Sequence, residues 1–338
     1  MNDLKKCWEM LPKVSRSFSL CIALLPKPIN SRMMLSYLIF RTIDTIEDST
    51  IGIKTKKDMF DAFLDTISQD AYDHKKAIDC RKQLLKKLTY SYEFMLLKDL
   101  DAMLRVFYST PKDERLALLR QAKQMAQGMY RFQKRSIDTF KDQDEYAFYV
   151  AGVVGYIFND LFYYNGVINN KKREHLKGYA KRYGLGLQKV NMIRDLCDDI
   201  PKRRYFWPKK AIEREGLAYK TICSEKNREK ALLILDEMIK NAVDYLNDGL
   251  YYVMSLPRKH LRVRVFCLIP LFMALESFIK CINNENVFIK GKKVKISKGK
   301  VKEIVRNSYL LGWSNFMLKR WYKKTMRRAD ASYHKPGP

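Results

Sequence analysis

Apolar residues recur every three or four positions through most of this 338-residue chain, and few helix breakers interrupt them. Residues 81–108 and 114–135 show the pattern, and residues 231–246 carry it as one stripe formed by Leu232, Leu235, Ile239, Val243 and Leu246. Only 14 Gly and 10 Pro are present, and the alternation that marks a strand is scarce. The pattern predicts amphipathic helices and an all-α fold.

The breaks between the expected helices are short. We place them at residues 26–31, 48–54, 110–113, 140–144, 201–208 and 283–299. None is long enough to mark a linker between two domains. We therefore expect one large domain over residues 1–305, followed by a basic, aromatic C-terminal helix and tail over residues 306–338.

The chain is strongly basic. Lys and Arg number 65 against 37 Asp and Glu, which gives a formal net charge of +28. Such an excess favours anionic partners, and nucleic acid, an anionic bilayer surface and polyphosphorylated substrates all qualify. The alternative is a lysine-rich composition that only keeps the protein in solution.

Cysteine usage and hydropathy bear on the compartment. The seven cysteines are scattered and form no CxxC pair, which is typical of reduced, buried thiols in a cytosolic protein rather than a disulfide framework. No uncharged apolar run reaches the roughly 20 residues of a membrane span. We expect a cytoplasmic protein that is soluble or peripheral on the cytoplasmic face of the membrane.

Two segments carry acidic side chains at helical spacing. In YLIFRTIDTIEDST, Asp44, Glu47 and Asp48 stand at positions i, i+3 and i+4. In QKVNMIRDLCDDIPKRRYFWP, Asn191, Asp195 and Asp199 stand at i, i+4 and i+8, with Asp198 on the same arc. Each set shares one face of a helix, where like charges repel unless a cation binds them.

The donor chemistry of these faces indicates which cation. Carboxylate and amide oxygens without His or Cys suit Mg²⁺ rather than Zn²⁺, and Mg²⁺ completes its shell with water and substrate phosphates. An Arg precedes each cluster, at Arg41 and Arg194. A solvated acidic surface or a helix cap is the alternative for either cluster alone. The spacing fits no EF-hand, and no P-loop or complete dinucleotide-binding turn is present.

At these residues the sequence resembles the squalene and phytoene synthase family. SRSFSL (15–20) resembles its N-terminal segment, FRTIDTIED (40–48) its first Asp-rich motif and YAFYVAGVVG (146–155) its central helix. LQKVNMIRDLCDD (187–199) resembles the second Asp-rich motif, followed by RRYFWP (203–208). CINNENVFIKGKKVKISKG (281–299) is similar to a region of the squalene branch. The motifs occur in family order over residues 15–299.

The resemblance implies a single-domain α-helical isoprenoid synthase fold with a large central cavity. It also implies a reaction in two halves. Two farnesyl diphosphates condense head-to-head to presqualene diphosphate, with Mg²⁺ (or Mn²⁺) as cofactor. A second ionisation, a rearrangement and hydride delivery from NADPH then give squalene.

The same resemblance assigns roles to residues. It implies metal ligation by Asp44, Glu47, Asp48, Asn191, Asp195 and Asp199. It implies catalytic roles for Tyr146, Asp44, Asp48, Asp195, Asp199 and Arg41. Substrate contacts are implied for Ser15, Arg16, Ser17, Phe18, Arg41, Arg194, Arg204, Gln188, Val150 and Val154. Arginines suit this role because they grip phosphate oxygens through charge-assisted hydrogen bonds.

Some of these residues have simpler interpretations. Tyr146 is the candidate for proton removal or steering, yet a phenol with a pKa near 10 is a weak base, and a buried aromatic is the alternative. Gly152 and Gly155 stand inside a helix, where Gly is unfavourable. They leave room either for a prenyl chain or for close packing of another helix.

NADPH carries several negative charges, and without a dinucleotide-binding turn it must be held by side chains. The candidates at the family position are Asn283, Asn284, Lys290, Lys293, Lys295 and Lys298. A solvated basic loop is the alternative for any one of these lysines. We expect farnesyl diphosphate as substrate, no nucleic-acid partner and a monomer.

Residues 309–328 mix aromatic side chains with Lys and Arg. This composition suits a helix that lies on an anionic bilayer, and a helix that packs on the domain is the alternative.

Two other functions remain open from sequence. One is a synthase of the same family that stops before reduction and releases dehydrosqualene, phytoene or presqualene diphosphate. The other is a non-catalytic basic helical protein that binds nucleic acid or lipid, which would have no use for two acidic helix faces.

Overall fold

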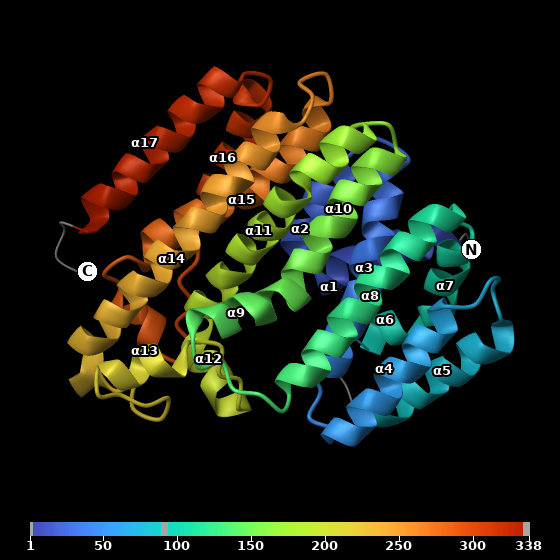
Figure 1. Ribbon diagram of the computed structural model, residues 1–338, viewed down its shortest axis with the longest axis horizontal. Helices are drawn as coiled ribbons and strands as arrows, with labels where there is room; N and C mark the ends of the chain where they lie inside the picture. Colours follow the sequence, from blue (N-terminus) through green and yellow to red (C-terminus); the bar gives the residue numbers. More distant parts are fainter. Residues whose placement is uncertain (1–2, 89–93, 334–338) are drawn as a thin grey trace. The chain divides into compact units, whose positions relative to one another are not determined.

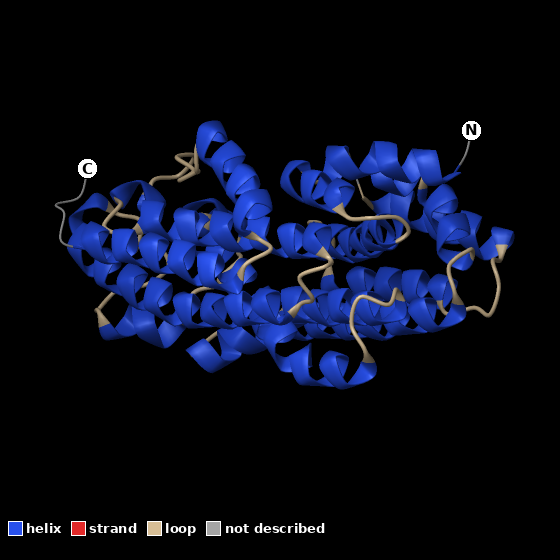
Figure 2. Ribbon diagram, turned by 90° about the horizontal axis from the view of Figure 1, so that it is seen from above, coloured by secondary structure: helices blue, strands red, loops and turns tan. Residues whose placement is uncertain are grey.

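The computed structural model describes residues 3–88 and 94–333, together with all side chains there except those of Arg16, Ser17 and Lys87. Every regular element within these residues is a helix, as the uniform colouring of Figure 2 shows. The prediction of an all-α fold is therefore confirmed. None of the described helices is both long enough and apolar enough to cross a bilayer.

The helices gather into two compact units, each built from separate stretches of the chain. Unit 1 comprises residues 1–134 and 156–173, and unit 2 comprises residues 135–155 and 174–338. The chain crosses from one unit to the other three times: once between α8 and α9, after residue 134, and twice inside helices, in α10 (Val153–Tyr164) and α11 (Asn170–Arg194). The expected division at residue 305 stays a prediction.

Unit 1 contains the N-terminal helices, coloured blue to green in Figure 1. They are α1 (Asp3–Val14), α2 (Arg16–Leu24), α3 (Ile29–Asp48), α4 (Ile53–Ile67), α5 (His74–Lys87), α6 (Phe94–Lys98), α7 (Leu100–Tyr108) and α8 (Lys112–Phe132). Helix α3 is central to this unit, since it packs against α1, α2, α4, α7 and α8. The stretch 81–108, where the periodicity predicts helical structure, contains the end of α5 together with α6 and α7.

Unit 2 contains the remaining elements. The α-helices that lie wholly within it are α9 (Phe140–Ala147), α12 (Leu196–Asp199), α13 (Lys209–Arg214), α14 (Arg228–Ser255), α15 (Leu261–Cys281), α16 (Lys298–Leu311) and α17 (Asn315–Tyr333). Shorter turns are the π-helix η1 (Phe148–Gly152) and the 3-10 turns η2 (Ile200–Lys202), η3 (Glu225–Asn227) and η4 (Glu285–Phe288). Helix α15 packs against α14, α16 and α17 and forms the core of the unit.

One predicted break is misplaced. We expected residues 140–144 to interrupt the helices, whereas α9 begins at Phe140. The reason is a capping box: the Thr139 hydroxyl accepts from the Asp142 backbone N–H, and the Asp142 carboxylate accepts from the Thr139 backbone N–H. The interruption therefore lies before Thr139.

The C-terminal helix α17 packs on unit 2 through its own apolar stripe. Trp321 stacks on Phe272 of α15, with ring centroids 3.4 Å apart, and the Tyr322 hydroxyl donates to Asn247 of α14. Arg328 donates two hydrogen bonds to Glu276, a carboxylate buried in α15. These contacts agree with the interpretation that this face of the helix packs on the domain.

Candidate functional site

The first acidic cluster lies on the less buried face of α3. Asp44 and Glu47 are half-buried and Asp48 is exposed, whereas the intervening residues belong to the core. The Arg41 guanidinium approaches the Asp44 carboxylate, with 3.6 Å between Nη1 and Oδ2. The spacing read from sequence thus places the carboxylates together, with a cation from the same helix beside them.

A buried lysine lies at the end of this helix. Lys56 of α4 is 6% exposed, and its ammonium donates to the Glu47 backbone carbonyl at 2.6 Å and to the Gln133 side chain at 3.2 Å. A cation at a helix C-terminus satisfies a free carbonyl and complements the helix dipole. Lys56 could not be predicted as part of this region, because nothing in its own segment indicates a partner on α3.

The SRSF segment forms the start of α2. Ser15 is the helix N-cap, and its hydroxyl accepts from the Phe18 backbone N–H at 3.3 Å. The Phe18 ring stacks on Tyr37 of α3, 5.7 Å between centroids. Both contacts are structural. The side chains of Arg16 and Ser17 lie outside the described residues.

The second acidic cluster spans the junction of α11 and α12. The predicted continuous helix is interrupted at Asp195, because α11 ends at Arg194 and α12 begins at Leu196. The helical bonding nevertheless continues, since Asp195 N–H donates to Asn191 O and Asp199 N–H donates to Asp195 O, both at 2.9–3.0 Å. The i, i+4, i+8 relation of the three residues is therefore preserved.

Asp195 is held by two cations. Arg194 Nη2 lies 2.9 Å from its Oδ2, and Lys293 Nζ lies 3.6 Å from its Oδ1. Burial raises the pKa of the Asp195 carboxyl, but hydrogen bonds and charge from Arg194 and Lys293 outweigh it, and the net pKa is lowered. Arg194 also donates to Asn191 Oδ1 at 3.1 Å. Gln188 accepts from the Asn191 amide at 3.4 Å.

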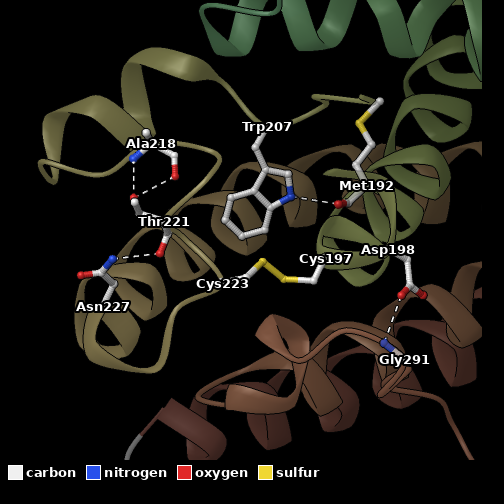
Figure 3. The surroundings of a disulfide bond; sticks show 9 residues. All are labelled: Met192, Cys197, Asp198, Trp207, Ala218, Thr221, Cys223, Asn227 and Gly291. Atoms are coloured by element: carbon white, nitrogen blue, oxygen red, sulfur yellow. Dashed lines mark hydrogen bonds between the residues drawn. A yellow bond between two sulfur atoms is a disulfide. The ribbon is translucent and has the colours of Figure 1, made fainter. Parts of the chain in front are cut away.

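The basic loop before α16 contacts this acidic segment. Lys293 Nζ lies 3.5 Å from Asp198 Oδ2, and the Gly291 backbone N–H donates to Asp198 Oδ1 at 3.1 Å (Figure 3). Lys293, predicted to bind cofactor, therefore pairs with the predicted metal ligand Asp195 and with its neighbour Asp198, and its role toward the cofactor stays a prediction. This contact could not be predicted from sequence, because the two segments are far apart along the chain.

The other predicted cofactor residues divide into two kinds. Lys290, Lys295 and Lys298 are exposed, as a site for a polyanion requires. The amide of Asn283 donates to the Ser332 and Tyr333 carbonyls, and Asn284 caps η4 by accepting from Asn286 N–H. The two asparagines thus have structural contacts at this position.

Tyr146 is buried at the end of α9. Its ring stacks on Phe206, 4.9 Å between centroids, and is 3% exposed. The π-helix η1 follows directly, and the half-buried Val150 and Val154 lie in and just after it. Such single π-turns occur frequently at functional sites. Arg204, downstream in the same unit, is half-buried.

A buried polar network supports this region. The fully buried Lys189 ammonium donates to Gln143 at 2.8 Å and to Asn241 at 2.7 Å, and it lies 2.6 Å from Asp144 Oδ1. The Gln143 amide in turn donates to the Phe206 carbonyl at 2.8 Å, under the ring that Tyr146 stacks on. Sequence analysis missed Lys189, since a lysine in an amphipathic helix gives no sign of burial.

Two cysteines are joined, contrary to the expectation of seven reduced thiols. Cys197 in α12 forms a disulfide with Cys223, with 6.4 Å between their Cα atoms (Figure 3). That separation lies within the normal range for a bridged pair. The loop that brings Cys223 back to α12 also positions Trp207, whose indole N–H donates to Met192 O at 2.8 Å. The remaining five cysteines are free and buried.

Close helix packing accounts for Gly155. A Cβ there would lie 2.1 Å from the Ala180 backbone oxygen of α11. The relation is reciprocal, because a Cβ on Gly184 of α11 would lie 2.3 Å from the Ala151 oxygen. At Gly152 the nearest atoms belong to side chains, Phe148 and Leu185 among them. Of the two interpretations of these glycines, helix packing holds at Gly155.

The donor sets fit Mg²⁺ better than a softer metal. Both clusters offer only carboxylate and amide oxygens, and the second already binds an ammonium, that of Lys293, between Asp195 and Asp198. No group of three His, Cys, Asp or Glu side chains suited to a metal ion occurs among the described residues. Mg²⁺ commonly takes one or two carboxylates and fills its shell from water and phosphate.

A cavity of about 570 Å³ in unit 2 lies elsewhere. Its wall includes Arg214, Glu237 and Lys240, and it contains none of the predicted site residues. Two of its carboxylates form ion pairs, Glu237 with Arg214 and Asp236 with Lys240. We therefore place the candidate site at the acidic clusters and not at this cavity.

Comparison with known proteins gives a consistent result. The family model described as squalene/phytoene synthase matches residues 11–300. A squalene synthase of Schizosaccharomyces pombe is 29% identical over 315 residues, covering 91% of this chain and 65% of that protein. Squalene synthase 1 of Arabidopsis thaliana is 32% identical over 285 residues, covering 83% and 66%. The chain thus spans about two thirds of the length of these curated relatives.

A solved structure has the same fold over nearly the whole chain. The structure of TcSQS in complex with a ligand superposes with a TM-score of 0.84 at 26% identity, covering 98% of this chain and 97% of that one. The helical arrangement described above is therefore shared with that protein.

Proposed function

The chain belongs to the squalene/phytoene synthase family, and we propose that it condenses two farnesyl diphosphates head-to-head and reduces the product to squalene. In the first half, one diphosphate and one proton leave as presqualene diphosphate forms. In the second half, the other diphosphate leaves and NADPH supplies a hydride. The relatives named squalene synthase support this choice over other products of the family.

The observation that carries the proposal is the chemistry of the two acidic clusters. Each offers several oxygen ligands on one helical face, and each has an arginine paired with one of its carboxylates. A cluster of this kind is useful to an enzyme that must hold polyphosphate, whereas a protein that binds nucleic acid gains nothing from it. We propose that both clusters act on the diphosphates of the bound substrates.

The residues of the chain have separable tasks in this reaction. Mg²⁺, when bound by the carboxylates of the two clusters, neutralises diphosphate and makes it a better leaving group. Arg41, Arg194 and Arg204 bind phosphate oxygens and orient them. The lowered pKa of Asp195 keeps its carboxylate ionised for this purpose.

The hydrocarbon part of the reaction needs an apolar wall without water. We propose that Tyr146, stacked on Phe206, lies at the reacting carbons and steers cyclopropanation or accepts the departing proton. Val150 and Val154 contact the prenyl chains, and Ser15, Arg16, Ser17, Phe18 and Gln188 complete the substrate contacts. Aromatic faces stabilise nearby cations, which suits a carbocation reaction.

The exposed lysines before α16 are the proposed NADPH anchor. Lys290, Lys295 and Lys298 offer three ammonium groups on one short segment. Lys293 is placed differently, since it already pairs with Asp195 and Asp198. We propose that it links the cofactor loop to the diphosphate site.

The products test the reaction directly. Purified protein with farnesyl diphosphate and Mg²⁺ is expected to accumulate presqualene diphosphate without NADPH and squalene with it, as read by product mass. An identical product in both incubations would show a family member that does not reduce. No prenyl product at all, together with salt-dependent DNA binding, would support a binding protein instead.

The cofactor anchor makes a separate prediction. We expect Lys295→Ala/Lys298→Ala to raise the KM for NADPH about tenfold or more, since hydrogen bonds to charged groups contribute roughly 1.5–3 kcal/mol each. Formation of presqualene diphosphate without NADPH should stay unchanged. The matched control is Lys171→Ala/Lys172→Ala, two exposed lysines on α11. Equal loss of both half-reactions would refute a cofactor-specific role.

We further propose that the protein is a monomer that works in the cytoplasm and touches the cytoplasmic face of the membrane. The Cys197–Cys223 bond is in tension with that compartment, because cytosolic disulfides are rare. The insolubility of squalene supports delivery of the product at a membrane.

A further inference from the structure

The junction of α16 and α17 exposes an unusual density of large apolar side chains. Leu310 is 60% exposed, Trp313 58% and Phe316 71%. With Tyr309 and Met317 they make up five of the twelve large exposed apolar residues found in the described part of the chain. We call these five residues the apolar tip. Exposed large apolar side chains that gather in one short segment are typical of an interaction site.

The exposure of the tip is fixed by packing beneath it. The buried Arg264 guanidinium donates to Leu256 O at 3.3 Å and to the Asn315 side chain, and the Asn315 amide donates to Met254 O at 3.0 Å. These bonds hold the first residue of α17 to the end of α14. The turn is therefore anchored with its apolar side chains outward.

The exposed ring of Trp313 offers an apolar surface to its surroundings. Its indole N–H donates to the Leu310 carbonyl at 2.8 Å, so its one polar atom is already satisfied within the turn. The ring is then free to enter an apolar phase without an unpaired donor.

Cations occur in the segments next to the tip. Lys319 and Arg320 follow Phe316 by three and four residues on α17, and Arg258, Lys259 and Arg262 lie at the start of α15 and the loop before it, which Arg264 ties to the turn. All five are exposed, and we call them the basic rim. No Asp or Glu occurs in residues 249–275 or 304–329.

We infer that the apolar tip and the basic rim dock on the surface of an anionic phospholipid bilayer. Aromatic and aliphatic side chains enter the headgroup boundary, and Lys and Arg are attracted to anionic lipid. A symmetric contact between two copies would bring two basic rims together. Nucleic acid would pair with the rim and leave the tip in water.

This inference rests on the proposed membrane contact and not on the proposed reaction. It also corrects the expectation for residues 309–328, because Trp321 and Tyr322 pack on the protein while the tip faces outward. The surface is the turn and the first turn of α17 rather than the whole helix.

Vesicle flotation of the full chain tests it. The protein should float with phosphatidylcholine vesicles that contain phosphatidylglycerol, and much less with phosphatidylcholine alone. Trp313→Ser/Phe316→Ser should weaken binding at least about tenfold, given the contribution of one buried aromatic side chain. Lys319→Gln/Arg320→Gln should weaken it about tenfold as well and reduce its salt dependence.

Matched variants separate this site from general stickiness. Leu116→Ser/Leu233→Ser removes two exposed apolar residues outside the tip and should leave vesicle binding unchanged. Thermal melts verify that each variant folds, and Phe316→Ser alone leaves the Trp313–Leu310 hydrogen bond intact.

Two results would overturn the inference. One is vesicle binding by Trp313→Ser/Phe316→Ser equal to that of the unmodified protein. The other is loss of self-association in sedimentation by that variant with vesicle binding intact, which would make the tip a contact between copies. Vesicle binding by a protein that forms no prenyl product would refute the reaction and leave the docking surface standing.

Discussion

Asp195→Asn should lower the turnover of farnesyl diphosphate on the order of a thousandfold, because metal-assisted charge neutralisation contributes several kcal/mol and each 1.36 kcal/mol is a factor of ten. The substitution keeps the shape of the side chain and removes its charge. The Asp195 carboxylate is ionised and lies against Arg194 and Lys293, so the charge is in place before any substrate arrives. Single-turnover assays with mass detection of presqualene diphosphate measure the loss.

A parallel variant and a control define what the loss means. Asp44→Asn on α3 should act in the same way through the first cluster. Asp248→Asn is the control, since that carboxylate is 25% exposed against 21% for Asp195 and also pairs with an arginine, Arg182. Melting curves confirm folding. Turnover like that of the unmodified protein in both cluster variants is incompatible with the proposed metal site.

Gly155→Ala and Gly184→Ala should each reduce the free energy of unfolding by more than about 3 kcal/mol, the upper end of the cost of overfilling a packed interior. The added Cβ would meet a backbone oxygen, at 2.1 Å in the first case and 2.3 Å in the second. A backbone atom in a helix cannot turn aside as a side chain can. The two helices must therefore separate, and urea titration followed by circular dichroism measures the result.

The matched control lies in the same helix. A Cβ on Gly178 of α11 meets no atom within 4 Å. Gly178→Ala should therefore stabilise the protein by about 0.5–1 kcal/mol, since Ala is the better helix former. If Gly155→Ala were no less stable than Gly178→Ala, close contact between these helices would not be what requires glycine.

Sequence patterns predict the features that depend on residues close together in the chain, such as helices and their shared faces. The periodicity of the apolar residues indicates the helices, and the spacing of Asp44, Glu47 and Asp48 indicates a shared face that the structure confirms on α3. The break near residue 140 was misplaced although its signal, Thr139 followed by Asp142, is local. The Thr139–Asp142 cap starts a helix even though the residues that follow it are polar.

Contacts between distant segments were beyond prediction. The contact of Lys293 with Asp195, the link from Lys189 through Gln143 to Phe206, and the bond of Cys223 to Cys197 all join segments that are distant in sequence. A side chain carries no sign in sequence of which remote partner the fold brings to it. The partners of a lysine depend on where the fold places it. Lys293 is an example, because it lies beside the carboxylates of Asp195 and Asp198.

The disulfide makes a covalent ring of residues 197–223, and the ring includes Arg203, Arg204 and Trp207, which follow the second acidic cluster. Asp198 and Asp199 are themselves part of that ring, directly after Cys197, so the disulfide restrains their motion. Thiol reductant opens the ring and leaves noncovalent contacts, such as that of Trp207 with Met192, to restrain the segment. Protein purified with reductant and protein purified without it therefore differ in covalent structure next to the second acidic cluster. The redox state of the protein should be controlled in every activity assay.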